Sequence, residues 1–412
     1  MTYVHFFEDI SIESVCACVA FPPKKLIVIG SNGNAIRRYA RSVSAMLHRR
    51  GHLVDTEVRT VPINDLSAVY DLLCKVMESE GNCSVCLNGG DELALVATGM
   101  LYEKYGTRPK LHRFNLTRGS ILDLHKDGRQ EVFEAPVISV EEMISLFGGK
   151  VVYCNEKPDG TRIWDMNPSF VSDIERAWQI CKANTKSWNN FASALGVLLD
   201  NRSERGGVVC SMSVADYEDA MLRDNGKVYY SPILMNKLYK AGLITQFSDR
   251  GVFSVTFKNE QVMHLLTVAG RALEMKIYLA AKNARSDGKK TYDDVVNGVF
   301  VDWDGIVNSA GGTVHTENEI DVMMTRGGIP VFISCKNGFF DANELYKLNS
   351  VAEQFGGEYA KKAIVASSLS SLGKGAAYIR ERAEDMGIVL IDDVKTMTDA
   401  QLERRLSTIW LS

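Results

Sequence analysis

Residues 318–338 read NEIDVMMTRGGIPVFISCKNG, and this stretch decides the fold of the last third of the chain. A glycine pair, Gly327 and Gly328, separates two runs of largely apolar residues. Glycine tolerates the positive φ angles that a two-residue hairpin turn demands. The stretch therefore predicts two antiparallel strands joined by a turn at the glycine pair.

The polar residues of this predicted hairpin gather on one face. A turn at the glycines places Asp321 opposite Ser334 and Glu319 opposite Lys336. Because side chains alternate between the two faces of a strand, these four residues share one face and leave the other apolar. Two carboxylates beside a lysine suit metal-assisted phosphodiester hydrolysis, in which oxygen ligands hold Mg²⁺ or Mn²⁺. The alternative is a solvated hairpin face with an ordinary cross-strand Glu–Lys pair.

The bulk composition indicates a globular protein with no strongly basic surface. The chain has 412 residues, 46% of them hydrophobic, and a formal net charge of −4, so nucleic acid would bind through a local groove. No apolar run approaches the roughly 18 residues of a membrane span, so no membrane partner is expected.

Nine scattered cysteines fit a reducing cytosol, which predicts a cytoplasmic location. The Cys83-x-x-Cys86 pair has no second pair, which favours a buried strand over zinc or redox chemistry.

The length predicts more than one domain, and the chain divides into three parts. Residues 1–150 alternate apolar strands, glycine turns and helices, which is typical of a doubly wound, Rossmann-like α/β sheet. Residues 151–262 are mixed α/β. Within them, residues 231–257 predict a helix and a two-stranded wing, either a DNA-binding winged helix or, as we favour, a connector. Residues 263–412 begin with one expected helix over 263–283 and continue with strands and helices around the hairpin.

Several motifs resemble those of a known family. An acid on one strand followed by an acid-x-lysine position on the next resembles the PD-(D/E)xK restriction-endonuclease-like nucleases. The sequences NEIDV, FISCKNG, ELYKL and RALEMKIY together are similar to the CRISPR ancillary nucleases, in which a CARF sensor domain precedes such a nuclease domain. In the first part, VHFFEDISIESVCACVAFPPKKLIVIGS (4–31) and CLNGGDELALVATGMLYE (86–103) resemble the strand, loop and helix pattern of a CARF domain.

The resemblance implies roles for three residues of the hairpin. Asp321 would bind the metal, and Lys336 would position or polarise the attacking water. Ser334 stands where the family carries a glutamate two residues before the lysine, and serine is a poor metal ligand. Ser334 could still hold a metal-bound water.

Three acids could replace the missing glutamate. Glu344 follows Lys336 by eight residues, but Asp341-x-x-Glu344 also matches a helix capping box, which is the interpretation we favour. Glu274 lies on the helix that opens the third part and could equally be an exposed helix carboxylate. Glu319 is nearest in sequence and could instead hold Lys336.

The resemblance also implies a binding site in the first part, for a cyclic oligoadenylate, with cyclic tetra-adenylate favoured. By position, the site would include Ser11, Ser31, Asn88, Gly89 and Gly90. Each serine could instead be an ordinary cap or turn residue. Asp91 and Glu92 depart from the family pattern, because two acids at a helix N-terminus would repel an anionic ligand, although Asp91 is also a good N-cap.

The expected protein is therefore a homodimeric, cyclic-oligoadenylate-activated, metal-dependent nuclease of type III CRISPR antiviral defence. The family implies single-stranded DNA or RNA as substrate. Nicking of supercoiled duplex DNA is a further activity that the sequence leaves open. Two alternatives remain at this point. One is a ligand-gated nucleic-acid-binding regulator whose nuclease domain is inactive. The other is a structure-specific DNA nuclease of repair or transposition whose first domain only dimerises it.

Overall fold

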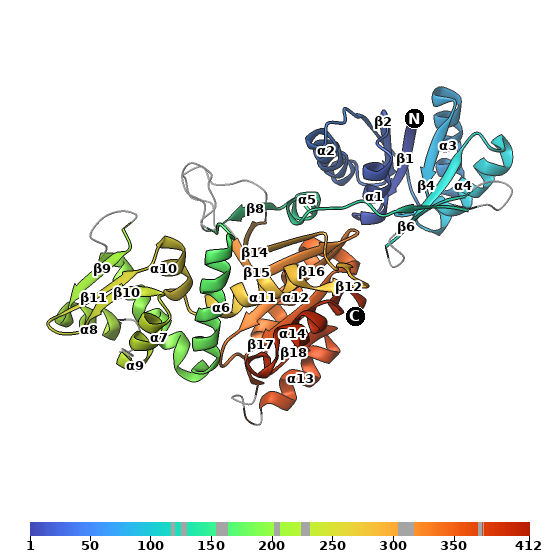
Figure 1. Ribbon diagram of the computed structural model, residues 1–412. Coiled ribbons are helices and arrows are strands. Elements are labelled where there is room, and N and C mark those ends of the chain that lie inside the picture. The colour runs from blue at the N-terminus through green and yellow to red at the C-terminus, as the bar shows by residue number, and fades with distance from the viewer. Residues whose placement is uncertain are drawn as a thin grey trace.

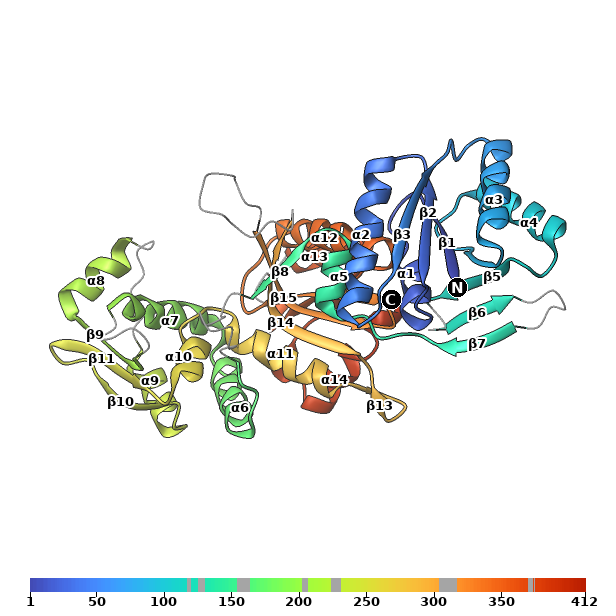
Figure 2. The ribbon, with the colours of Figure 1, turned by 90° about the horizontal axis from the view of Figure 1, so that it is seen from above.

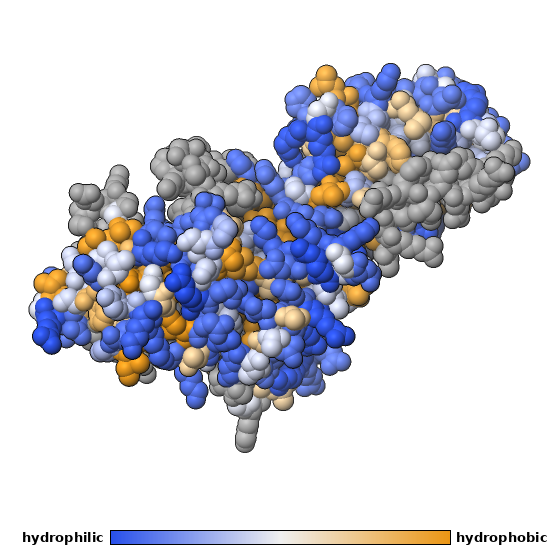
Figure 3. Space-filling model, in the orientation of Figure 1, coloured by the Kyte–Doolittle hydropathy of each residue, from blue (hydrophilic) through white to orange (hydrophobic). Residues whose placement is uncertain are grey.

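A computed structural model describes residues 1–116, 120–124, 130–153, 164–201, 207–223, 231–303, 317–369, 373 and 375–412. These residues form three bodies that lie in a row, with the C-terminal body between the other two (Figure 1, Figure 2). On the face seen in Figure 3, hydrophilic residues predominate and apolar residues lie in smaller groups between them. No helix within the described ranges is both long and apolar enough to cross a membrane.

The N-terminal body is a doubly wound sheet, as its sequence predicts. Its seven strands run in the order β3-β2-β1-β4-β5-β6-β7, with the first five parallel and the last two antiparallel. The strands are β1 (Thr2–Phe7), β2 (Lys25–Gly30), β3 (Asp55–Thr60), β4 (Cys83–Cys86), β5 (Lys110–Asn115), β6 (Ser120–Leu124) and β7 (Gln130–Glu134). Helices α1 (Ile12–Ala20) and α2 (Gly33–Arg49) cover one face, and α3 (Leu66–Glu80) and α4 (Glu92–Tyr105) cover the other. Cys83 and Cys86 are both buried in β4, which confirms the predicted buried strand.

The middle body is a small helical module with a three-stranded sheet. Its strands run in the order β10-β11-β9. The elements are α6 (Pro168–Lys182), α7 (Thr185–Val197), β9 (Val209–Ser213), α8 (Val214–Arg223), α9 (Pro232–Lys240), β10 (Ile244–Ser248), β11 (Val252–Phe257) and α10 (Glu260–Leu266). The predicted helix and two-stranded wing are thus confirmed as α9, β10 and β11. The apolar core of this module is continuous with one face of the C-terminal body.

The C-terminal body is a six-stranded mixed sheet in the order β18-β17-β16-β15-β14-β8. Its strands are β8 (Lys150–Tyr153), β14 (Asp294–Asp302), β15 (Glu317–Arg326), β16 (Ile329–Lys336), β17 (Lys361–Ala366) and β18 (Ile388–Ile391). Helices α11 (Arg271–Asn283) and α14 (Asp399–Leu406) cover one face. Helices α5 (Val140–Leu146), α12 (Asn343–Gly356) and α13 (Gly375–Asp385) cover the other. A small hairpin of β12 (Arg285–Ser286) and β13 (Lys289–Lys290) follows α11.

One helix was expected over residues 263–283, and this expectation is wrong. The chain forms α10 and α11 with a break between them, where Gly270 has φ +85°. A left-handed residue cannot continue a right-handed helix, so the apolar spacing on either side of Gly270 belongs to two helices rather than one.

The glycine turn of the β15–β16 hairpin packs directly against the N-terminal body. Gly327 and Gly328 have φ +53° and +90°, which confirms the predicted two-residue turn. A Cβ added to Gly328 would lie 2.9 Å from Cγ2 of Ile12 and 3.0 Å from Sγ of Cys16, both on α1. Apolar residues of α1, β15 and β16 belong to one continuous core, so the first and third bodies are joined by packing and not only by the chain.

This close approach predicts a specific cost for a methyl group at the turn. Gly328→Ala should lower the free energy of unfolding by about 3 kcal/mol, because it adds a clash to an unfavourable φ angle. Gly288→Ala is the matched control, since Gly288 has φ +76° but no atom within 4 Å of an added Cβ, and should cost about 1 kcal/mol. Urea unfolding followed by tryptophan fluorescence measures both. Equal losses would show that the turn does not pack on α1.

Candidate active site and ligand pocket

The polar cluster lies where the two strands of the hairpin part. The β15–β16 ladder runs from Arg326↔Ile329 to Val322↔Ile333 and stops one rung before the predicted Asp321–Ser334 pair. In place of that rung, Oδ2 of Asp321 accepts hydrogen bonds from the Cys335 backbone N–H (2.5 Å) and from Oγ of Ser334 (3.3 Å). Asp321 and Ser334 are therefore in contact through their side chains, while the expected Glu319–Lys336 rung is not formed.

Three carboxyl groups lie near one another beside these strands: Glu274 is buried, Asp321 is partly buried and Glu319 is exposed at the edge of the group. Glu274 reaches the site from α11 and is 8% exposed, so its interpretation as an exposed helix carboxylate is wrong. Burial, reinforced by the nearby Asp321, raises the pKa of Glu274 to about 8. Burial also raises the pKa values of Glu319 and Asp321. Carboxyl groups that resist ionisation in this way would be relieved by a bound cation.

Glu344 has a different surrounding from the other acids. The predicted capping box is absent, because Ala342 is the N-cap residue of α12 and Asp341 accepts instead from the Asn343 backbone N–H (3.0 Å). The Glu344 carboxylate binds the ammonium groups of Lys336 and Lys347. Burial alone would raise its pKa, but the hydrogen bonds from the two lysines hold the pKa of Glu344 below its ordinary value.

Arg271 is a site residue that the sequence reasoning missed. It lies one helical turn before Glu274 on α11, with Nε 3.6 Å from Oε2 of Glu274. The side chain is 7% exposed, and its Nε and Nη1 atoms have no hydrogen-bond partner. Its guanidinium lowers the pKa of Glu319, opposing the larger effect of burial. The Arg-x-x-Glu spacing in RALEMKIY was the available signal, because residues i and i+3 share one helix face.

The donor set suits a hard divalent cation. Glu274, Glu319 and Asp321 offer carboxylate oxygens, which Mg²⁺ and Mn²⁺ prefer, and Oε2 of Glu274 has no hydrogen-bond partner. The three carboxylates are not close enough together to hold an ion as they stand. Among the described residues, one group of three or more His, Cys, Asp or Glu side chains has its ligand atoms within 4.8 Å of one another, and it consists of His5, Cys86 and His112 in the core of the N-terminal sheet. The carboxylates would therefore have to draw closer together on binding an ion.

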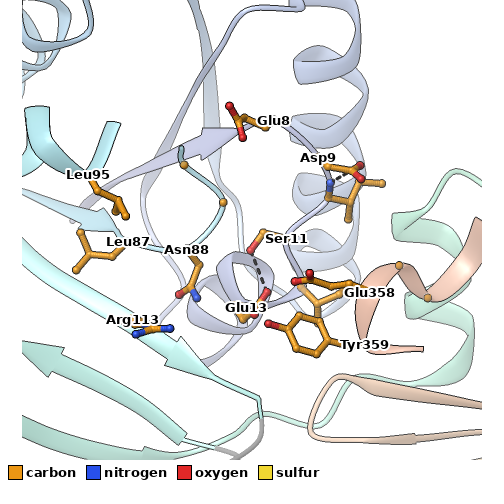
Figure 4. A pocket seen from close by; sticks show the side chains of 16 residues that line it. Glu8, Asp9, Ser11, Glu13, Leu87, Asn88, Leu95, Arg113, Glu358 and Tyr359 are labelled. Atoms are coloured by element: carbon orange, nitrogen blue, oxygen red, sulfur yellow. Dashed lines mark hydrogen bonds between the residues drawn. The ribbon is translucent and has the colours of Figure 1, made fainter. Parts of the chain in front are cut away.

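A second site is a cavity of about 680 Å³ between the first and third bodies (Figure 4). The loops after β1 and β4 form one side of it, and the segment Gly356–Tyr359 at the end of α12 forms another. The structure brings together four of the five predicted ligand residues here, namely Ser11, Asn88, Gly89 and Gly90. Ser31 is exposed at the end of β2 and does not line the cavity.

Each of these loop residues also has a local structural task. Oγ of Ser11 caps α1 by accepting from the Ser14 backbone N–H (3.2 Å). The Asn88 side chain holds β4 to β5, accepting from the backbone N–H of Phe114 (2.8 Å) and donating to its carbonyl (3.1 Å). Gly89 has φ +79°, and an added Cβ would lie 2.9 Å from the carbonyl oxygen of Phe6. Asp91 caps α4 as predicted, accepting from the Ala94 backbone N–H (2.8 Å).

Most of the charged residues that line the cavity are acids. Its charged lining residues are Glu8, Asp9, Glu13, Glu358 and Arg113. Burial, with the nearby Asp91 and Glu92, raises the pKa of Glu8. In Figure 4 Tyr359 and Glu358 face Ser11 and Glu13 from the C-terminal body. Burial and the neighbouring Glu13 carboxylate raise the pKa of Tyr359, so this contact links the end of α12 to the first turn of α1.

Fold and sites together define an α/β protein in which a doubly wound domain with a loop-lined cavity packs on a mixed sheet carrying an acid–lysine cluster. No family model matches the chain, and no curated protein matches it in sequence. Among solved structures it is similar to Can2 from Sulfobacillus thermosulfidooxidans in complex with cyclic tetra-adenylate, with a TM-score of 0.67 and 17% identity over 99% of both chains. It is also similar to protein VC1899 from Vibrio cholerae, with a TM-score of 0.68 and 17% identity over 100% of this chain and 97% of the other. These likenesses show the fold and extend over the whole length.

The different surroundings of Glu274 and Glu344 predict opposite effects of neutralising them. Glu274 has a pKa near 4.5 in the unfolded chain and about 8 in the folded protein. Between these two pH values the unfolded chain ionises more readily, so the free energy of unfolding falls as the pH rises. In EDTA at pH 8, Glu274→Gln should therefore stabilise the protein, by roughly 1–3 kcal/mol, and the gain should vanish below about pH 4.5. Glu344→Gln should destabilise it, because a lowered pKa contributes stability above the unfolded pKa.

Thermal unfolding of both variants between pH 4 and 8 measures these effects. Adding Mn²⁺ should then raise the melting temperature of the wild type more than that of Glu274→Gln. A melting temperature for Glu274→Gln below that of the wild type at pH 8 in EDTA would contradict the description of Glu274 as a strained buried acid.

Proposed function

We propose that this protein is a metal-dependent nuclease activated by a cyclic oligoadenylate, working as a homodimer in type III CRISPR antiviral defence. One observation carries the proposal: α12 connects the two sites. Its first turn presents Glu344 to Lys336, and its last residue, Gly356, lines the cavity together with the turn that follows. A ligand in the cavity thus contacts the helix that holds the candidate catalytic lysine.

Asp321 and Glu274 would hold the Mg²⁺ or Mn²⁺, with Glu319 as a third carboxylate. The bound ion would supply activation of a water molecule and neutralisation of charge on the scissile phosphate. Ser334 donates to Asp321 and keeps its carboxylate oriented. Lys336 would position the attacking water, and the unpartnered guanidinium atoms of Arg271 would bind a phosphate oxygen.

Activation would act through α12. Glu344 holds the ammonium group of Lys336, and this ion pair competes with binding of the lysine to a water molecule or a phosphate. A cyclic oligoadenylate, with cyclic tetra-adenylate favoured, would touch the Gly356–Tyr359 segment and shift α12. A ligand changes such an equilibrium only as far as it binds the two states differently, and contacts to a moving segment meet this condition.

A second copy of the chain would complete the cavity. Helix α4 buries Ala94, Ala97 and Leu101 on its inner face. Its outer face is also apolar, with Leu95, Val96 and Met100 between 40% and 50% exposed. Neighbouring apolar side chains exposed on one helix often mark an interface with a partner. Leu95 also lines the cavity, so a partner packed on α4 would meet the ligand.

A ligand-gated nucleic-acid-binding regulator is the second candidate. It is favoured by Ser334, which removes one expected carboxylate, and by the wing formed by β10 and β11 in the middle body. A structure-specific nuclease of repair or transposition would need the same acidic site but no nucleotide. Activity measurements separate these candidates.

The enzyme should cleave labelled single-stranded DNA or RNA in Mn²⁺ or Mg²⁺ only when cyclic tetra- or hexa-adenylate is present. Asp321→Asn and Lys336→Met should each lower the cleavage rate by about 100-fold or more. Lys347→Met is the matched control, because Lys347 binds the same Glu344 carboxylate but is 71% exposed, and it should retain activity within a few-fold. Absence of cleavage in every condition would favour the regulator, and cleavage indifferent to the nucleotide would remove the sensor role.

The contact between Tyr359 and α1 gives a separate test of the coupling. Tyr359→Phe removes the hydroxyl that faces Glu13 and should lower nucleotide-activated cleavage by about tenfold, while nucleotide binding changes by less than about threefold. Tyr346→Phe is the control, since Tyr346 lies on α12 itself but binds Arg382 away from the cavity. Titration of activity against cyclic tetra-adenylate, with affinity from calorimetry, measures both quantities. Unchanged activation in Tyr359→Phe would exclude this contact from the coupling.

A further inference from the structure

A second cavity, of about 560 Å³, opens directly after the candidate catalytic lysine. It lies at the carboxyl ends of β16 and β17, where the backbone N–H of Ser367 donates to the carbonyl of Lys336 (2.9 Å). Helix α7 of the middle body closes its other side. Its lining includes Lys186, Asn189, Asn337, Phe339, Ser367 and Lys395.

The wall of this cavity carries polar atoms without partners. Asn337 is 5% exposed and Ser367 is 1% exposed, and neither Oδ1 of Asn337 nor Oγ of Ser367 has a hydrogen-bond partner. The Asn337 amide is nevertheless held in place. Its Nδ2 donates to Oδ1 of Asn189 (2.9 Å), and Nδ2 of Asn189 donates to the Asn337 carbonyl (2.5 Å). Unpartnered buried polar atoms cost about 1–3 kcal/mol each, so a pre-oriented amide and hydroxyl here point to a polar ligand.

The rim of the cavity combines an exposed aromatic ring with positive charge. Phe339 is 79% exposed, which is unusual for a ring of its size. It also borders a neighbouring apolar cavity of about 310 Å³ that contains Tyr378, itself 54% exposed. Lys186 is exposed and Lys395 half-buried at the same rim. Proteins bind single-stranded nucleic acid by stacking its bases on aromatic rings and by placing lysine or arginine side chains along its phosphate backbone.

We propose that this cavity binds the unpaired nucleotide next to the scissile phosphate, with its base stacked on Phe339 and its edge bonded by Asn337 and Ser367. Lys186 and Lys395 would bind the flanking phosphates. This inference rests on the proposed nuclease function and adds to it a subsite that binds one unpaired nucleotide beside the cleavage point. A base already stacked and paired in a duplex cannot reach Phe339, so the site selects single strands over duplexes.

Phe339→Ala is the decisive variant, because the side chain is exposed and its removal leaves the core intact. In a catalytically inert Asp321→Asn background with Mg²⁺, fluorescence anisotropy of a labelled single-stranded oligonucleotide should show binding about tenfold weaker for Phe339→Ala. Affinity for the matching duplex should change by less than about twofold, and Phe339→Tyr should retain the single-strand affinity. Leu53→Ala is the matched control, since Leu53 is 82% exposed but lies in the N-terminal body.

Measurements with and without cyclic tetra-adenylate, together with cleavage by proteins that retain Asp321, separate this inference from the proposed function. If Phe339→Ala binds and cleaves single strands as the wild type does, the subsite is wrong and the nuclease stands. If the wild type never cleaves but Phe339→Ala loses single-strand affinity, the subsite stands and the nuclease does not. The subsite would be overturned if Phe339→Ala lost equal affinity for single strand and duplex. It would also be overturned if the Asp321→Asn protein did not bind single strands at all. Asn337→Ala should reproduce the loss where its melting temperature shows that it folds.

Discussion

The hydrogen bond from the Cys335 backbone N–H to the Asp321 carboxylate is the interaction on which the candidate active site depends. It occupies the donor that a further ladder rung would use, so β15 and β16 are paired up to Val322 and separate beyond it. That separation lets the side chains of Glu319, Asp321 and Lys336 face a common space instead of standing in a flat row on a sheet. The same bond opposes the effect of burial on the pKa of Asp321 and so favours the ionised form that a cation requires.

The two ends of this hairpin make different tertiary contacts, the turn with the N-terminal body and the other end with α12 of the C-terminal body. At the turn, Gly328 lies against α1 with no room for a methyl group. At the other end, Lys336 is held by Glu344 at the start of α12. The last residue of this helix, Gly356, is packed as tightly as Gly328, because an added Cβ would lie 2.8 Å from side-chain atoms of both Pro330 and Ala360. Because tightly packed interfaces do not deform continuously, a displacement at the cavity has to move α12 as a unit or leave it in place.

Much of the fold could be predicted from local pattern, and the failures at the candidate site have a common origin in tertiary packing. The glycine pair and the alternation around it were sufficient for the hairpin, because turn geometry and register are local properties. The break over residues 267–270, which includes Gly270 at φ +85°, was missed because apolar spacing continues across it. The pairing of Lys336 with Glu344 rather than Glu319 depends on where α12 packs, which no local pattern reports. Burial of Glu274 against Asp321 depends likewise on the position of α11.

Ser334 can be understood from the charge balance of the site. Burial and Asp321 already raise the pKa of Glu274 to about 8. A glutamate at position 334 would add a further carboxylate next to Asp321 and raise these pKa values again, unless a second cation were bound. With serine there, the strand supplies a hydroxyl that orients Asp321, and α11 supplies the acid together with Arg271. In the proposed metal site the second acid would therefore come from α11 rather than from the strand, and the guanidinium of Arg271 lies near enough to Glu274 to offset part of its charge.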